Sequence, residues 1–120
     1  MQTTIRDRAG IKMLHLNGRL MGGPETEQFK TTLKELIDAN HSRFLIDLGG
    51  VDWLNSSGLG ALICSYVRVT RSGGLIAFTG TDKVQQLIEM TCLHEVLDVY
   101  ESTEDAVAYL LSEDFQPPAH

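Results

Sequence analysis

The order of apolar and polar positions along the chain predicts an alternation of strands and helices. Residues 3–8 and 11–20 have strand character, and the turn-forming run Asp7-Arg8-Ala9-Gly10 between them predicts a hairpin. Further along the chain, residues 43–48 and 75–78 predict buried strands, and residues 96–100 predict a last strand. The chain therefore opens with a hairpin and continues with single strands.

Helical spacing of apolar residues occurs between and after these strands. Helices are predicted from Pro24, over residues 57–71, from a cap at Asp82, and after the capping pair Ser102 and Asp105. The stripes predicted to face the core are Phe29, Leu33, Leu36 and Ile37; Leu59, Leu62, Ile63, Tyr66 and Val67; Val84, Leu87 and Ile88; and Val107, Leu110 and Leu111.

The resulting order, ββαβαβαβα, predicts a single α/β domain. Strands that alternate with helices after a hairpin give a mixed sheet, here with about four helices. The chain has 120 residues, which favours one domain. We expect the domain to cover residues 1–112 and residues 113–120, which include two consecutive prolines, to form a flexible tail.

Composition and charge exclude several classes of protein. The formal net charge is −6, whereas a nucleic-acid-binding protein needs a basic face to meet phosphates. The same charge disfavours an anionic membrane surface, and no apolar run approaches the length of a membrane span. The N-terminal residues lack the apolar core of a signal peptide. We therefore expect a soluble cytoplasmic protein, with Cys64 and Cys92 reduced.

The stretch "DWLNSSGLGALI", residues 52–63, raises the main question about function. Asn and Ser are preferred at helix starts because their side-chain oxygens accept bonds from free backbone N–H groups. One cap needs one residue, yet Asn55, Ser56 and Ser57 stand in a row. Gly58 and Gly60 each cost about 0.5–1 kcal/mol inside a helix. The serines either cap a helix or provide a site of modification.

A phosphoryl group on Ser56 would suit a helix start. It would carry about −1.5 to −2 charges at neutral pH, and the positive end of the helix would stabilise it. The fold should therefore tolerate the modification. A partner protein packed on this helix end would instead meet a dianion, which costs several kcal/mol in an apolar or acidic interface.

Enzymatic alternatives lack their motifs. A serine hydrolase needs Gly two residues before its nucleophile, and Leu54 holds that position relative to Ser56. No phosphate-binding GxxxxGK[ST] loop occurs, and an aspartate-type phosphoreceiver would not open with a hairpin. The histidines show no metal-ligand spacing. We expect a protein that is not an enzyme and holds neither a metal nor a cofactor.

The segments "FLIDLGGVDW" and "LNSSGLGALI" resemble the phosphorylation-site signature of the STAS domain family of bacterial anti-sigma-factor antagonists. The segments "LHLNGRL" and "GGLIAFTG" are similar to that family in order and spacing, so the resemblance runs from about residue 5 to 111. It implies that an anti-sigma kinase, which itself binds ATP, phosphorylates the antagonist, and that a PP2C-type phosphatase reverses the step. The unphosphorylated antagonist binds the kinase and releases the sigma factor.

By this resemblance Ser56 is the phosphoacceptor, with Ser57 as the alternative. The implied partner-binding residues are Met21, Gly22, Asn55, Ser56, Ser57, Gly58, Leu59 and Leu62. We expect a monomer or weak dimer that binds no nucleic acid and no membrane. The chain departs from the best-known members at Asn55, which replaces Asp, and at Met21, which replaces an acidic residue. These departures keep a second hypothesis open, a STAS interaction module that is never phosphorylated and serves a transporter or a stress-sensing scaffold.

Overall fold

The computed structural model describes residues 2–90, 97 and 99–111, and within them the predicted order ββαβαβαβα is confirmed. The sheet has the strand order β1-β2-β3-β4-β5; β1 is antiparallel to β2, and the other neighbouring pairs are parallel. The elements are β1 (Gln2–Arg8), β2 (Ile11–Leu20), α1 (Pro24–Asp38), β3 (Arg43–Leu54), α2 (Ser56–Arg71), β4 (Leu75–Gly80), α3 (Asp82–Glu89), β5 (Val99–Tyr100) and α4 (Thr103–Leu110).

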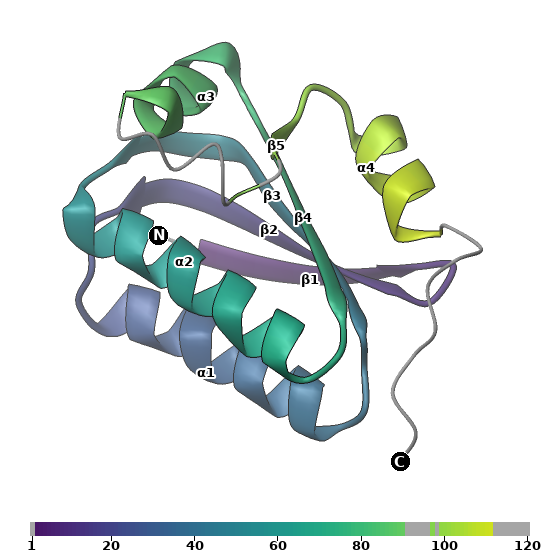
Figure 1. Ribbon diagram of the computed structural model, residues 1–120. Coiled ribbons are helices and arrows are strands. Elements are labelled where there is room, and N and C mark those ends of the chain that lie inside the picture. Colours follow the sequence, from purple (N-terminus) through teal and green to yellow (C-terminus); the bar gives the residue numbers. More distant parts are fainter. Residues whose placement is uncertain (1, 91–96, 98, 112–120) are drawn as a thin grey trace.

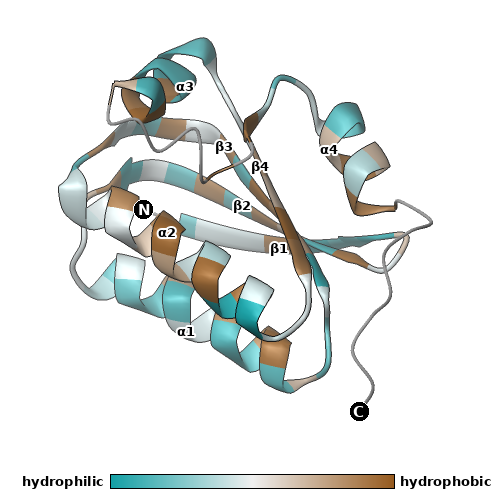
Figure 2. Ribbon diagram, viewed as in Figure 1, coloured by the Kyte–Doolittle hydropathy of each residue, from teal (hydrophilic) through white to brown (hydrophobic). Residues whose placement is uncertain are grey.

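The helices cover both faces of the sheet. Helices α1 and α2 run side by side on one face, and α4 lies on the other (Figure 1). The larger core cluster joins the sheet to α1, α2 and α3 through residues such as Phe29, Leu62 and Val84. A smaller cluster lies under α4 and includes Leu45 and Leu110. In Figure 2 apolar residues gather along the central strands and on α2.

The hairpin and the helix starts follow local sequence chemistry. Ala9 and Gly10 have φ of 53° and 82°, the positive values that a two-residue hairpin turn requires. Pro24 stands at the start of α1, and Ser102 caps α4 by accepting a hydrogen bond of 3.1 Å from Asp105 N. The cap of α3 was predicted wrongly. Thr81, which has extended backbone, accepts from Val84 N, because the Asp82 backbone is already helical.

Strand β3 is longer than the apolar run predicted. It continues from residue 48 to Leu54 because β2 is long and remains paired with it as far as Leu20↔Leu54. Two register shifts accommodate the extension, one between the pairs His15↔Asp47 and Asn17↔Gly50 and one between Gly18↔Val51 and Arg19↔Trp53, and at each of them β3 has one residue more than β2. Helix α2 begins at Ser56, one residue earlier than predicted. The extended pairing brings the ends of β2 and β3 together beside the start of α2.

The stripe predicted on α2 is partly wrong. Leu59 and Leu62 are buried as predicted. Ile63, Tyr66 and Val67 are half-buried, and of these three Tyr66 packs against the larger core cluster. The buried positions that the pattern missed are Ala61, Ser65 and Val69. Small residues allow α2 to lie close to its neighbours along that side, and the Ser65 hydroxyl donates to Ala61 O at 2.8 Å. The helix is therefore rotated, and Ile63 and Val67 lie toward its outer side.

Some predictions concern segments of which the structure describes only a part. The strand predicted over 96–100 is described as β5 at Val99–Tyr100, with Leu97 buried beside it. The predicted tail at 113–120 and Cys92 lie outside the described residues. Cys64 is described as a free, half-buried thiol.

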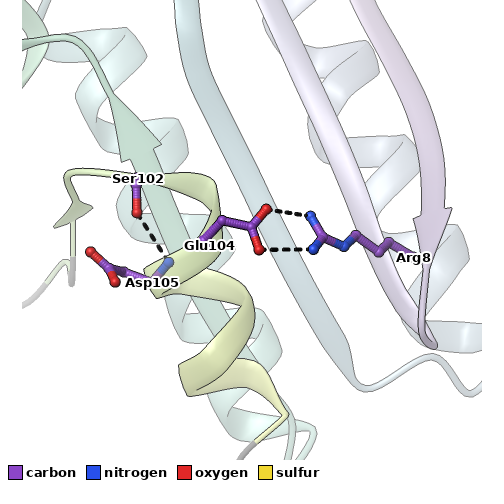
Figure 3. Close-up of polar contacts among 4 residues, drawn as sticks. All are labelled: Arg8, Ser102, Glu104 and Asp105. Atoms are coloured by element: carbon purple, nitrogen blue, oxygen red, sulfur yellow. Dashed lines mark hydrogen bonds and ion pairs between the residues drawn. The ribbon is translucent and has the colours of Figure 1, made fainter.

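An exposed ion pair joins the hairpin to α4, and it should make a pH-dependent contribution to stability. Arg8 donates two hydrogen bonds of 2.9 Å to the Glu104 carboxylate (Figure 3). These bonds and, next, the Arg8 charge lower the pKa of Glu104 below 4.5. The contribution is therefore complete above that value and is lost as the pH falls through the folded-state pKa. Arg8→Gln should lower the thermal midpoint slightly at about pH 7 and by less at about pH 3, since protonation of Glu104 weakens the pair. An equal difference at both pH values would contradict this assignment.

Candidate functional site

Asn55 connects the start of α2 to the loop that follows β2. Its side-chain Oδ1 accepts from Gly58 N at 2.9 Å, and its Nδ2 donates to Met21 O at 3.0 Å. A backbone N–H can only donate and a carbonyl can only accept, so the two contacts fix the orientation of the amide. The Asn55 backbone N–H also donates to Leu20 O at 3.3 Å. Asn55 is therefore both a helix cap and a tie between two loops.

Gly58 permits the close approach of β2 to α2. A Cβ built on Gly58 would lie 1.8 Å from Leu20 O, a distance that no side chain could occupy. Gly22, which has φ of 87°, packs against Ser57, and a Cβ built on Gly22 would lie 3.0 Å from Ser57 Cβ. Gly58, one of the two glycines that are costly inside a helix, is thus required because the backbone of Leu20 lies against it.

Ser56 is the first residue of α2, and its side chain is exposed. The first turn of the helix contains no acidic residue, and the backbone N–H groups of such a turn carry partial positive charge. A phosphoryl group on Ser56 would therefore project to solvent from a favourable electrostatic position. Ser57 is also exposed, but it stands against Gly22, which leaves less room for a bulky group.

The other predicted partner-binding residues divide into two groups. Met21 is 40% exposed beside Asn55, so its side chain is open to a partner. Gly58, Leu59 and Leu62 are buried, with Leu59 6% and Leu62 0% exposed. In the described structure these three residues support the site from the interior.

The tie made by Asn55 should have a measurable effect on stability. Asn55→Ala removes both the cap and the bond to Met21, and is expected to lower the free energy of unfolding by about 1–3 kcal/mol. Asn55→Asp can still accept from Gly58 N but cannot donate to Met21 O, so about 0.5–1.5 kcal/mol should be lost. Urea denaturation of both variants tests this order. Equal stability of Asn55→Asp and the wild type would show that the tie contributes nothing.

A cleft next to the serines contains residues that sequence reasoning missed. Arg19, Met21, Asp52, Trp53 and Lys83 line a cleft of about 400 Å³. Trp53 is 44% exposed, and the Lys83 ammonium lies 6.0 Å from its ring centroid. No pattern in the sequence predicted that Lys83 and Arg19 line this cleft. They meet only in the folded protein, through the pairing of β2 with β3 and the packing of α3.

Two features were found in no part of the described chain, a cluster of metal-binding side chains and a membrane-spanning helix. Within residues 2–90, 97 and 99–111, no group of three or more His, Cys, Asp or Glu side chains could hold a metal ion. His15 and Asp47 form a pair instead, with Nδ1 and Oδ2 atoms 2.7 Å apart. None of the helices in the described part of the chain is both long and apolar enough to span a bilayer.

A comparison with models of protein families assigns residues 2–106 to the STAS domain. The chain belongs to the STAS domain family. The match covers most of the sequence, including both loops of the site, and confirms the resemblance that the serine-glycine segment indicated. No curated protein matches the chain.

Solved structures share the fold of this STAS domain. An anti-sigma factor antagonist from Mycobacterium paratuberculosis superimposes with a TM-score of 0.79 at 19% identity, covering 92% of this chain and 94% of that one. The Bacillus cell fate determinant SpoIIAA in its phosphorylated form gives 0.68 at 13% identity, over 90% and 98%. A murine anion transporter of solute carrier family 26 gives 0.69 at 20% identity, over 88% of this chain and 18% of that one. Similarity at these identities establishes the fold.

Proposed function

We propose that this STAS domain is an anti-sigma-factor antagonist that binds an anti-sigma kinase and is switched off by phosphorylation of Ser56. The observation that carries the proposal is the position of Ser56, which is exposed at the start of a helix whose first turn contains no acidic residue. The backbone beneath it is held by Asn55 and Gly58, so a partner meets an ordered surface. The similar anti-sigma factor antagonist folds support this choice.

In this proposal the domain is a cytoplasmic binding module without catalytic activity of its own. The partner kinase binds the ATP, and a PP2C-type phosphatase removes the phosphate. The surface available to the kinase comprises Met21, Gly22, Asn55, Ser56 and Ser57, while Gly58, Leu59 and Leu62 hold it in place from the interior. A phosphate on Ser56 adds charge at the centre of this surface and leaves the core unchanged.

The proposal is tested by intact-mass measurement and peptide mapping of the protein from its native host. A phosphatase-sensitive phosphate on Ser56 during growth or stress is expected. Protein that is unmodified at Ser56 and Ser57 under both conditions would exclude the switch. A phosphate found on Ser57 alone would identify Ser57, and not Ser56, as the phosphoacceptor.

A second candidate function is favoured by the similarity to the anion transporter of solute carrier family 26. In that case the domain would be an interaction module that is never phosphorylated, and Ser56 would be only an exposed residue of the helix start. The genes next to this one discriminate between the two functions. A gene for an ATPase of the anti-sigma kinase type supports the switch, and transporter genes support the module.

Trp53 offers a probe of the proposed interface. It is the only tryptophan of the chain, and it is exposed in the cleft next to Met21. Aromatic residues in such positions often dominate binding energy, so Trp53→Ala is expected to weaken kinase binding by about tenfold or more. Its fluorescence in the wild type should shift when the purified kinase is added. Unchanged affinity and unchanged fluorescence would place the cleft outside the interface.

A further inference from the structure

A row of polar side chains crosses four strands of the sheet. The register places Thr4 opposite His15, His15 beside Asp47, and Asp47 beside Thr79. Alternate residues of a strand point to the same face, and Leu45, two positions before Asp47, packs in the cluster under α4. The row therefore lies on the face of the sheet that carries α4, opposite to α1 and α2 (Figure 1).

Asp47 fixes the orientation of the His15 ring. Its Oδ1 accepts from Gly49 N at 2.8 Å and from the Thr79 hydroxyl at 3.2 Å, and its Oδ2 lies 2.7 Å from His15 Nδ1. An ionised carboxylate only accepts hydrogen bonds, so Nδ1 carries a hydrogen and donates it. In the neutral ring Nε2 is then an acceptor. Nε2 is buried and has no hydrogen-bond partner among the described residues, so it requires a donor.

His15 lines a cavity of about 350 Å³ on this face, which we call the β-face cavity. The residues that line it are Thr4, Arg6, His15, Leu16, Asn17, Asp47 and Gly50. A Cβ built on Gly50 would lie 1.8 Å from Asn17 Oδ1, so only glycine at this position lets the Asn17 amide lie against β3. Among the lining residues Arg6 is the only lysine or arginine. The cavity thus combines one unsatisfied acceptor with one guanidinium, which only donates.

We infer that the β-face cavity binds a small hydroxy acid, whose hydroxyl donates to His15 Nε2 and whose carboxylate accepts from Arg6. Arg6 stands two residues along β1 from Thr4, about 7 Å of strand, and its long side chain can span that distance. The oxygens of Asp47 already accept hydrogen bonds, and its charge repels the ligand carboxylate toward Arg6. These charges select one orientation of the ligand.

The site is independent of the proposed switch at Ser56, because it lies on the other face of the sheet from α2. The His15 side chain is 27% exposed while its Nε2 is buried, so the exposed side chains around the ring must shift when the hydroxyl enters. The binding test accordingly needs neither the kinase nor a phosphate.

Three small molecules test the inference by NMR of the purified full chain at about pH 8, where histidine is ordinarily neutral. Lactate carries both a hydroxyl and a carboxylate, propionate lacks only the hydroxyl, and lactamide lacks only the charge. Lactate should shift the nitrogen resonance of His15 Nε2 and saturate below about 50 mM. Propionate and lactamide should each bind at least about tenfold more weakly, since each lacks one of the two contacts.

Matched variants assign the two contacts, with the amide resonances of Gly49 and Gly50 as the readout. His15→Asn keeps a donor for Asp47 but has no acceptor at the position of Nε2, and it should abolish the preference for lactate over propionate. Arg6→Gln should weaken lactate binding by about tenfold or more. Arg8→Gln removes the same charge from the same strand outside the cavity, and it should leave the affinity unchanged.

Each other outcome overturns the inference. Equal affinity for lactate and propionate would reduce the site to an anion bound at Arg6 alone. Equal affinity for lactate and lactamide would remove the carboxylate contact. The absence of any shift at about 50 mM lactate would show that the cavity holds only water. Equal losses in Arg6→Gln and Arg8→Gln would assign the effect to net charge and not to the cavity.

Discussion

Gly58→Ala is expected to lower the free energy of unfolding by about 3 kcal/mol or more. The new Cβ would lie 1.8 Å from the carbonyl oxygen of Leu20 and 2.7 Å from its carbonyl carbon. Both are backbone atoms, so no side-chain rotation relieves the overlap, and either β2 or α2 must move. Movement of α2 away from β2 would also lengthen the hydrogen bonds from Asn55 to Leu20 O and Met21 O. The helix propensity that alanine adds is about 1 kcal/mol and cannot offset these losses.

The experiment compares Gly58→Ala with Gly60→Ala in urea denaturation. Both changes add one methyl group to the first turns of α2, and only the first meets a backbone. The two variants should therefore differ in the sign of their effect. If Gly58→Ala proves as stable as the wild type, β2 and α2 are further apart than described. A large loss of stability would also explain any loss of partner binding by this variant, so its binding is not a test of the interface.

Ser56→Asp is expected to weaken kinase binding by about 2 kcal/mol or more, which is about 30-fold, and phosphorylation should weaken it further. Ser56 is exposed, and its helix start contains no acidic residue, so the free domain should tolerate the new charge. The kinase surface must instead desolvate that charge when it packs on the helix start. The loss therefore falls on the complex and leaves the free protein folded.

Matched variants at neighbouring positions give this experiment its controls. Ser56→Ala should bind the kinase within a few-fold of the wild type, because a neutral exposed hydroxyl contributes little. Ser57→Ala tests the alternative phosphoacceptor and should retain phosphorylation at Ser56. Titration calorimetry with the purified kinase supplies the affinities, and circular dichroism confirms the fold. Equal affinity of the wild type, Ser56→Asp and Ser56→Ala would refute the charge mechanism.

Features encoded by neighbouring residues could be predicted from the sequence. The element order followed from alternating apolar patterns, and Pro24 and Ser102 marked helix starts correctly. The row of Asn55, Ser56 and Ser57 located the exposed end of α2, because capping depends on residues that are close in sequence. The sequence also marked Gly58 as costly inside a helix, and the Leu20 backbone that lies against it explains that cost.

Features that depend on distant residues could not be predicted. The Asn55 amide reaches Met21, 34 positions away, and Trp53 meets Lys83 through the packing of α3. The rotation of α2 was also hidden. Hydrophobic spacing favours large apolar residues as the buried stripe, whereas Ser65 and Ala61 are buried because they are small. These are effects of packing between elements, which a pattern along one element does not contain.

The edge of the sheet formed by β1 also determines how this protein can meet other copies of itself at high concentration. Strand β1 stands at one end of the strand order, and most of its residues are exposed. Its second half carries charges of alternating sign at Arg6, Asp7 and Arg8. Charged edges of this kind oppose the addition of a further strand, which is the first step toward aggregation. The charges on β1 thus oppose the joining of two copies through this edge when the protein is concentrated.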